Sequence, residues 1–172
     1  MDIKLLILDN DGVLTDGSII YDDNRLESKA FSVKDGLGIK LLKYTDIEVA
    51  IITGRKSDLL LQRCEDLNIK HIYQDVRNKL SVTENLMKKL NINWNNVAYI
   101  GDDWNDYPVM NRAILSACPG DAFNSIKKKV HYVCNREGGK GAVREFINLI
   151  LKKKMVYDKI IDKYLKSIQN NE

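Results

Sequence analysis

Hydrophobic residues along the chain gather in short continuous runs, which are separated by longer amphipathic segments. The strongest runs cover residues 5–8, 49–52 and 97–100, and weaker ones cover residues 71–73, 114–117 and 130–133. Runs of this length without polar alternation are typical of parallel strands that are buried on both faces. These runs therefore predict the strands of one parallel sheet.

The segments between the runs have the residue spacing of amphipathic helices. They cover residues 38–44, 57–67, 79–90, 107–112, 122–128 and 141–154. Strands that alternate with helices form right-handed βαβ units and an open parallel sheet with helices on both faces. The predicted fold class is thus α/β, with a Rossmann-like parallel sheet.

One stretch near the start of the chain interrupts this alternation. Residues 18–21 and 26–33 are rich in β-forming side chains, and they flank a polar turn at residues 22–25. This pattern predicts a small β-hairpin, inserted at about residues 17–33 after the first strand.

The end of the chain has a pattern of its own. We expect one domain over residues 1–154 and a C-terminal tail over residues 155–172. In a helical tail, Ile161, Leu165 and Ile168 share one face. Such a stripe needs a partner surface, which is either the tail's own domain or a neighbouring chain.

Composition narrows the class of protein. A chain of 172 residues, 44% of them hydrophobic, can bury one sizeable core and is too short to form two comfortably. Its 27 basic and 24 acidic residues are interspersed, without the basic stripe of a nucleic-acid partner.

The cysteines and the first residues bear on location. Cys64, Cys118 and Cys134 are widely spaced and odd in number, which predicts reduced core thiols rather than a metal or redox site. The first apolar run is too short for a signal peptide or a membrane helix, so we expect a cytoplasmic protein without a membrane partner.

Acidic residues follow two of the strongest apolar runs. Asp9 follows the first run, Asp11 lies two residues later, and Asp102 follows the run at residues 97–100. Ligands of parallel sheets bind beyond the carboxyl ends of the strands, so these side chains should converge. Two carboxylates about 4 Å apart repel by roughly 4 kcal/mol, and a cation relieves that repulsion. Ligands that are all oxygen favour Mg²⁺ over zinc.

The same groups support phosphoryl transfer. Asp9 is placed to attack phosphorus, and Asp11 to protonate the leaving oxygen and later to activate water. Thr53, which ends another strand before Gly54, can hold phosphate near a helix start. Lys79, at the start of a predicted helix, can act as a compact positive charge.

These motifs and their order resemble those of the haloacid dehalogenase superfamily. The matching segments are residues 9–13, Thr53, Lys79 and residues 101–106. The resemblance implies that Asp9 and Asp102 bind Mg²⁺ through their side chains and Asp11 through its carbonyl, with Asp103 or Asp106 in support.

Longer stretches are similar to one group of that superfamily, the phosphatases of 3-deoxy-D-manno-octulosonate 8-phosphate, a sugar acid of lipopolysaccharide biosynthesis. The similar stretches are residues 11–17, 33–39, 53–55 and 138–145. The resemblance implies no large cap and a homotetramer assembled through the hairpins, with a tail that can reach a neighbouring active site. It also implies a substrate-binding set made of Thr53, Gly54, Arg55 and Lys79, with residues 136–140 nearby.

Three other functions remain open at this point. A phosphatase for a related nine-carbon ulosonate phosphate shares most of these motifs, although Arg55 favours the eight-carbon substrate. A response-regulator receiver also combines acidic residues, Thr and Lys, but it has no Asp two residues beyond its phosphorylated Asp. The third is a catalytically silent scaffold subunit, against which the intact motifs argue.

Overall fold

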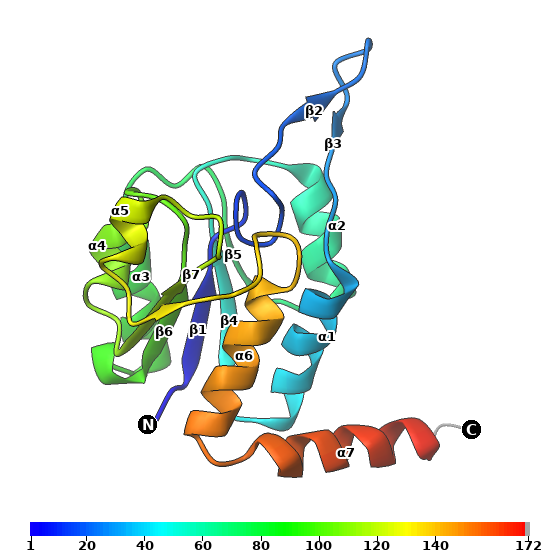
Figure 1. Cartoon of the computed structure of the whole chain (residues 1–172), viewed down its shortest axis with the longest axis vertical. Coiled ribbons are helices and arrows are strands. Elements are labelled where there is room, and N and C mark those ends of the chain that lie inside the picture. The colour runs from blue at the N-terminus through cyan, green and yellow to red at the C-terminus, as the bar shows by residue number, and fades with distance from the viewer. Residues whose placement is uncertain (171–172) are drawn as a thin grey trace.

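The computed structural model describes residues 1–170. In this part of the chain, six parallel strands form the central sheet, in the order β5-β4-β1-β6-β7-β8 (Figure 1). The strands are β1 (Leu5–Leu8), β4 (Glu48–Ile52), β5 (His71–Tyr73), β6 (Val97–Ile100), β7 (Leu115–Cys118) and β8 (Tyr132–Val133). The predicted α/β class and parallel sheet are confirmed.

Helices cover both faces of the sheet. They are α1 (Val33–Leu41), α2 (Asp58–Asp66), α3 (Lys79–Leu90), α4 (Tyr107–Met110), α5 (Asn124–Lys127), α6 (Ala142–Lys153) and α7 (Tyr157–Gln169), with short 3-10 turns at Leu42–Tyr44 and Trp94–Asn96. None of these helices has the length and hydrophobicity that crossing a bilayer requires.

The strand side chains divide the core into two layers. Leu6 and Leu8 of β1 pack with α1, α2 and α6, while Leu5 and Ile7 pack with α3, α4 and α5. All four side chains are fully buried, and each such side chain contributes about 1.5–3 kcal/mol to folding. The continuous apolar runs are therefore explained by burial on both faces.

The first helix begins earlier than the sequence pattern predicts. It starts at Val33 rather than at residue 38, because the Ser32 hydroxyl caps it by accepting a hydrogen bond from the Asp35 amide at 3.3 Å. Gly36 and Gly38 weakened the helical pattern. Their absent side chains leave room for neighbours, since a Cβ would stand 2.4 Å from Arg63 at Gly36 and 2.9 Å from Arg144 at Gly38.

The predicted hairpin is present between β1 and α1. Its strands β2 (Ile20–Tyr21) and β3 (Glu27–Ser28) pair antiparallel and project away from the sheet (Figure 1). The second strand is much shorter than the predicted stretch at residues 26–33, because Ser32 and Val33 belong to the start of α1. Ile20, Tyr21 and Leu26 are exposed by half or more.

The helical tail lies across the ends of α1 and α6 (Figure 1). Within α7, from Tyr157 to Gln169, the buried side chain is Ile160, and the Tyr44 hydroxyl lies 2.6 Å from that of Ser167. Leu165 and Ile168 stay about half exposed. Ile161 of the predicted stripe packs, partly buried, against the domain core together with Ile160 and Tyr164, so the tail contacts its own domain through one edge of the stripe and the positions next to it.

Candidate active site

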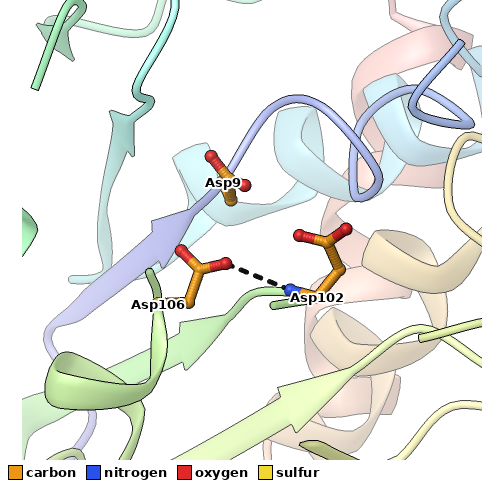
Figure 2. Close-up of side chains that lie close together, drawn as sticks. All are labelled: Asp9, Asp102 and Asp106. Atoms are coloured by element: carbon orange, nitrogen blue, oxygen red, sulfur yellow. Dashed lines mark hydrogen bonds between the residues drawn. The ribbon is translucent and has the colours of Figure 1, made fainter. Parts of the chain in front are cut away.

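Two adjacent strands bring the acidic residues together. Leu8 of β1 pairs with Ile100 of β6, and the Asp9 amide donates to the Ile100 carbonyl at 3.1 Å. Carboxylate oxygens of Asp9, Asp102 and Asp106 lie within 4.8 Å of one another (Figure 2). The expected convergence of Asp9 and Asp102 at the carboxyl edge of the sheet is therefore present.

Lys79 lies between two of these carboxylates. Its Nζ atom is 2.8 Å from Asp9 Oδ1 and 2.7 Å from Asp106 Oδ1, and its side chain is only 1% exposed. Burial by itself lowers the pKa of an ammonium, but the two carboxylates outweigh burial and raise the pKa of Lys79. Lys79 is therefore a fixed positive charge beside Asp9.

Asp106 is fully buried, and its hydrogen bonds hold the neighbouring groups in place. One oxygen accepts from Lys79 and from the Tyr99 hydroxyl at 2.5 Å, and the other accepts from the Asp102 and Asp103 amides at 3.2 and 3.4 Å. An oxygen that already accepts two hydrogen bonds is a poor ligand for a cation. We therefore interpret Asp106 as the residue that orients Lys79 and the Asp102 loop.

The remaining carboxylates suit a hard cation. Burial first, and then the charge of Asp106, raise the pKa of Asp9 to about 8 and that of Asp102 to about 7. A divalent cation removes this penalty, because it stabilises the charged form of both groups. The backbone also approaches closely here: a Cβ at Gly12, where φ is +85°, would stand 2.1 Å from Asp102 Oδ2.

A pocket of about 520 Å³ opens above these carboxylates. It is lined by Asp9, Asp11, Gly17, Thr53, Gly54, Arg55, Asp102, Asp103, Trp104 and Asn105. Thr53 is held at the end of β4, where its amide donates to the Tyr73 carbonyl at 3.0 Å. The predicted catalytic, substrate-binding and metal residues all line this pocket except Lys79, which reaches the site through its contact with Asp9.

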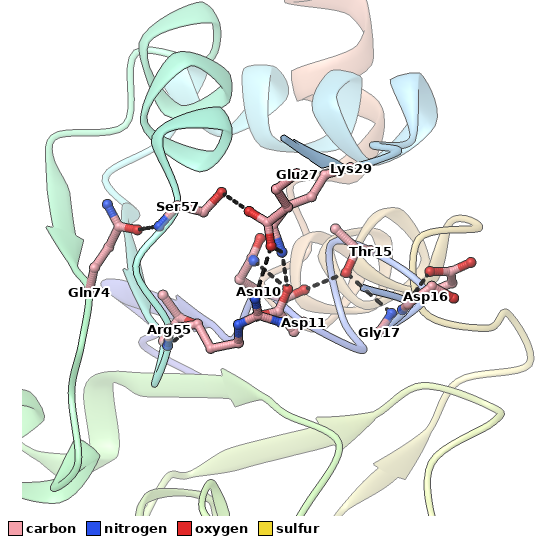
Figure 3. A network of polar contacts seen from close by, with 12 residues as sticks. Asn10, Asp11, Thr15, Asp16, Gly17, Glu27, Lys29, Arg55, Ser57 and Gln74 are labelled. Carbon is pink, nitrogen blue, oxygen red and sulfur yellow. Dashed lines mark hydrogen bonds and ion pairs between the residues drawn. The ribbon is translucent and has the colours of Figure 1, made fainter. Parts of the chain in front are cut away.

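Two residues of the hairpin, Glu27 and Lys29, contact residues of the site. The sequence pattern does not predict that they belong to it. Lys29 Nζ contacts Asp11 Oδ1, and Glu27 accepts a hydrogen bond from Arg55 at 3.0 Å (Figure 3). In a predicted hairpin, charged residues are typical of exposed positions, so the sequence carries no signal for their burial.

The loop at residues 136–141 packs against the loop that follows β1. The Gly139 amide donates to the Val13 carbonyl at 2.9 Å, and a Cβ at Gly138 would collide with the Gly12 carbonyl. Arg136 and Lys140 line a separate basic pocket with Lys34 and Arg144. Within the described residues the loop therefore supports the site, and its predicted place near the substrate stays a prediction.

Comparison with known proteins gives concordant matches. Residues 68–147 match a model for haloacid dehalogenase-like hydrolases. The 3-deoxy-D-manno-octulosonate 8-phosphate phosphatases of Escherichia coli K12 and Salmonella typhimurium are each 50% identical over 149 residues, which cover 87% of this chain and 79% of each relative.

Solved structures have the same fold. The Moraxella catarrhalis phosphatase of that name, in complex with magnesium, phosphate and the sugar acid, has a TM-score of 0.91 at 40% identity and covers 95% of this chain and 94% of its own. The Yersinia pestis phosphatase has a TM-score of 0.87 at 46% identity, with coverages of 92% and 84%.

Proposed function

The chain belongs to the 3-deoxy-D-manno-octulosonate 8-phosphate phosphatase family of haloacid dehalogenase-like hydrolases, and on this premise we propose that Asp9 is the nucleophile that removes the phosphoryl group from that sugar acid. The chain is a phosphoric monoester hydrolase. The observation that carries the assignment is the buried contact of Lys79 with Asp9 next to Asp102.

The reaction has two displacement steps at phosphorus. In the first, an Asp9 oxygen forms a bond to phosphorus, the ester bond to the sugar breaks, and Asp11 donates a proton to the leaving oxygen. In the second, Asp11 takes a proton from water, the water oxygen bonds to phosphorus, and the Asp9 carboxylate leaves. Thr53 and Lys79 hold the phosphoryl oxygens through both steps.

The metal site follows from the same residues. Asp9, Asp102 and the Asp11 carbonyl are the groups that would hold Mg²⁺, which when bound neutralises phosphoryl oxygens and orients phosphorus. The raised pKa values of Asp9 and Asp102 support this assignment, because they mark a site that disfavours two uncompensated charges. A Moraxella catarrhalis relative was solved with magnesium, phosphate and the sugar acid.

Arg55 is the proposed contact for the carboxylate of the substrate. It lines the pocket beside Thr53 and Gly54, and its side chain is 35% exposed. A guanidinium can bind a carboxylate through two parallel hydrogen bonds, which a lysine cannot do. This contact would distinguish a sugar acid phosphate from a neutral sugar phosphate.

We also propose a homotetramer that forms through the hairpin. The exposed Ile20, Tyr21 and Leu26 support this assembly, because apolar side chains that cluster on a projecting hairpin mark an interaction surface. A cytoplasmic location in lipopolysaccharide biosynthesis accords with the three free, buried cysteines.

A screen of purified enzyme against sugar phosphates tests the substrate. With Mg²⁺, phosphate release should be fastest from the eight-carbon ulosonate phosphate, slower from nine-carbon ulosonate phosphates, and slowest from hexose phosphates. Asp9→Asn should abolish release without changing the oligomer. A preference for the nine-carbon substrates or for hexose phosphates would refute the proposed eight-carbon substrate. The role of Asp9 would still be tested by the activity of Asp9→Asn.

A further inference from the structure

The foot of the hairpin, which we define as Glu27 and Lys29, reaches into the active site. Figure 3 shows both side chains turned toward the loop that follows β1 and toward Arg55. The Lys29 side chain is 1% exposed and that of Glu27 is 17% exposed, while the apolar tip of the same hairpin is open to solvent. The hairpin thus has a buried charged foot and an exposed apolar tip.

Lys29 holds one oxygen of Asp11. Asp11 Oδ1 accepts from Lys29 Nζ and, at 2.9 Å, from Asn10 Nδ2. The other oxygen, Oδ2, is buried and has no hydrogen-bond partner within residues 1–170. Lys29 and Asn10 therefore hold Asp11 Oδ1, and Oδ2 is the oxygen that a substrate can engage.

Glu27 holds Arg55 in the same manner. Glu27 Oε1 accepts from Arg55 Nη2 at 3.0 Å, and Oε2 accepts from the Ser57 hydroxyl at 2.9 Å. The Ser57 amide in turn donates to Gln74 Oε1 at 2.6 Å, which ties the contact to the main domain. Arg55 Nη1 is buried, and no acceptor for it exists in the described part of the chain.

Unpaired buried polar atoms are rare in folded proteins, and each needs an explanation. Among residues 1–170 there are three on side chains: Asp11 Oδ2, Arg55 Nη1 and Asn10 Oδ1. Two of the three belong to groups that line the pocket, and each is the free atom of a group that the hairpin foot anchors. A substrate that is both a phosphate ester and an acid offers a partner to each.

We propose that Glu27 and Lys29 are positioning residues, which direct Arg55 Nη1 to the carboxylate of the substrate and Asp11 Oδ2 to the oxygen that leaves phosphorus. The inference rests on the proposed function and adds the hairpin foot to it. Positioning matters because a displacement of about 1 Å at a reacting group can cost about 100-fold in rate.

Two variants with two substrates separate this role from a merely structural one. The substrates are 3-deoxy-D-manno-octulosonate 8-phosphate and p-nitrophenyl phosphate, which has no carboxylate. Glu27→Ala should raise KM for the sugar acid by about 10-fold and change KM for p-nitrophenyl phosphate by less than about 2-fold, because only the former uses Arg55. Lys29→Met should lower kcat for both substrates by about 30-fold or more, because both need Asp11.

Conservative variants and surface controls complete the design. Glu27→Gln, which keeps an acceptor for Arg55, and Lys29→Arg, which keeps the charge, should each recover most of the loss. Asp23→Ala and Lys40→Met change exposed residues outside this network and should behave as wild type. Melting temperature and size-exclusion elution show that each variant is folded and assembled.

The results that overturn the proposal are distinct from those that overturn the function. Equal KM changes for both substrates in Glu27→Ala, or an unchanged kcat in Lys29→Met, would refute the positioning role. The positioning role would also be refuted if the loss of activity in each variant matched its loss of folded protein, and if Lys29→Arg and Glu27→Gln lost as much activity as Lys29→Met and Glu27→Ala. If wild-type enzyme hydrolyses p-nitrophenyl phosphate but not the sugar acid phosphate, the proposed substrate is wrong, and Lys29 is still tested on p-nitrophenyl phosphate.

Discussion

The active site has two walls that differ in origin and in burial. The sheet wall consists of Asp9, Thr53, Lys79, Asp102 and Asp106, which stand on or near the strand ends. Lys79, Asp9 and Asp106 have almost no exposure, and their contacts lie between 2.7 and 2.8 Å. Parallel strands in register hold such groups rigidly, as phosphoryl transfer requires.

The hairpin wall consists of Glu27, Lys29 and Arg55. It depends on a short two-stranded insertion, and its Arg55 side chain is about one third exposed. A two-stranded hairpin is marginally stable unless it packs against other structure. This wall therefore depends on the burial of the hairpin foot in the chain and on the proposed contact of the exposed tip with other subunits. Under the proposed function, the sheet wall therefore supplies the nucleophile and the groups that hold the phosphoryl oxygens, whereas the hairpin foot positions Asp11 and Arg55.

The largest expected effect belongs to the nucleophile on the sheet wall. Asp9→Asn should lower kcat by about 10⁴-fold or more on any phosphate ester, because an amide cannot form the covalent intermediate. Steady-state phosphate release measures this loss, and Asp23→Asn on the exposed hairpin turn is the matched control. Full activity of Asp9→Asn would show that another group attacks phosphorus.

The next effect separates a metal ligand from a residue that orients its neighbours. Asp102→Asn should raise the Mg²⁺ concentration for half-maximal activity by about 100-fold, whereas Asp106→Asn should lower kcat by about 10-fold and shift that concentration much less. The contrast follows from the four hydrogen bonds that Asp106 already accepts. A titration of activity with Mg²⁺ measures both, and equal shifts would place Asp106 among the ligands.

A smaller and more selective effect is expected on the hairpin wall. Arg55→Ala should raise KM for 3-deoxy-D-manno-octulosonate 8-phosphate by about 20-fold, because it removes a charge-assisted hydrogen bond. KM for p-nitrophenyl phosphate should stay within about 2-fold. Equal losses on the two substrates would mean that Arg55 acts on the phosphoryl group, and the division between the walls would fail.

The smallest effect is on stability without metal. The raised pKa values of Asp9 and Asp102, about 8 and about 7, exceed the ordinary value of 3.8. At pH values between 3.8 and about 8, these two carboxyl groups hold more protons in the folded state than in the unfolded chain. The free energy of unfolding therefore falls as pH rises through this range. In EDTA, Tm should be about 5 °C lower at pH 8 than at pH 5, and Mg²⁺ should raise Tm more at pH 8.

Differential scanning fluorimetry measures these melting temperatures. Asp102→Asn is the control, and its Tm should depend less on pH because one of the two carboxylates with a raised pKa is gone. A Tm in EDTA that is equal or higher at pH 8 would contradict the account of the crowded carboxylates.

The sheet wall was predictable from the sequence, whereas most of the hairpin wall was not. Asp9, Thr53 and Asp102 follow apolar runs, and the carboxyl ends of parallel strands converge for any such sequence. Lys29 and Glu27 follow a polar turn in a short hairpin, where charged residues are normally solvated. Their burial depends on contacts with Asp11 and Arg55, which come from distant parts of the sequence and which no local pattern encodes.

The same distinction explains the errors in the element boundaries. The sequence pattern predicts a helix from residue 38, whereas α1 begins at Val33. Glycine is a poor helix former, but Gly36 and Gly38 lie within α1 because Arg63 and Arg144, from distant segments, pack closely against them. Tertiary contacts likewise decide that, within α7, Ile160 is buried and Ile161 packs against the core while Leu165 and Ile168 stay exposed.

The role of Asp9 as nucleophile is tested by locating the phosphoryl group during turnover. The enzyme is mixed with excess substrate and Mg²⁺, quenched in acid within milliseconds, digested and examined by mass spectrometry. We expect a transient phosphate on the peptide that contains Asp9, labile to hydroxylamine and absent in Asp9→Asn. Phosphate on another residue, or steady turnover with no phosphorylated peptide in the wild-type enzyme, would contradict it.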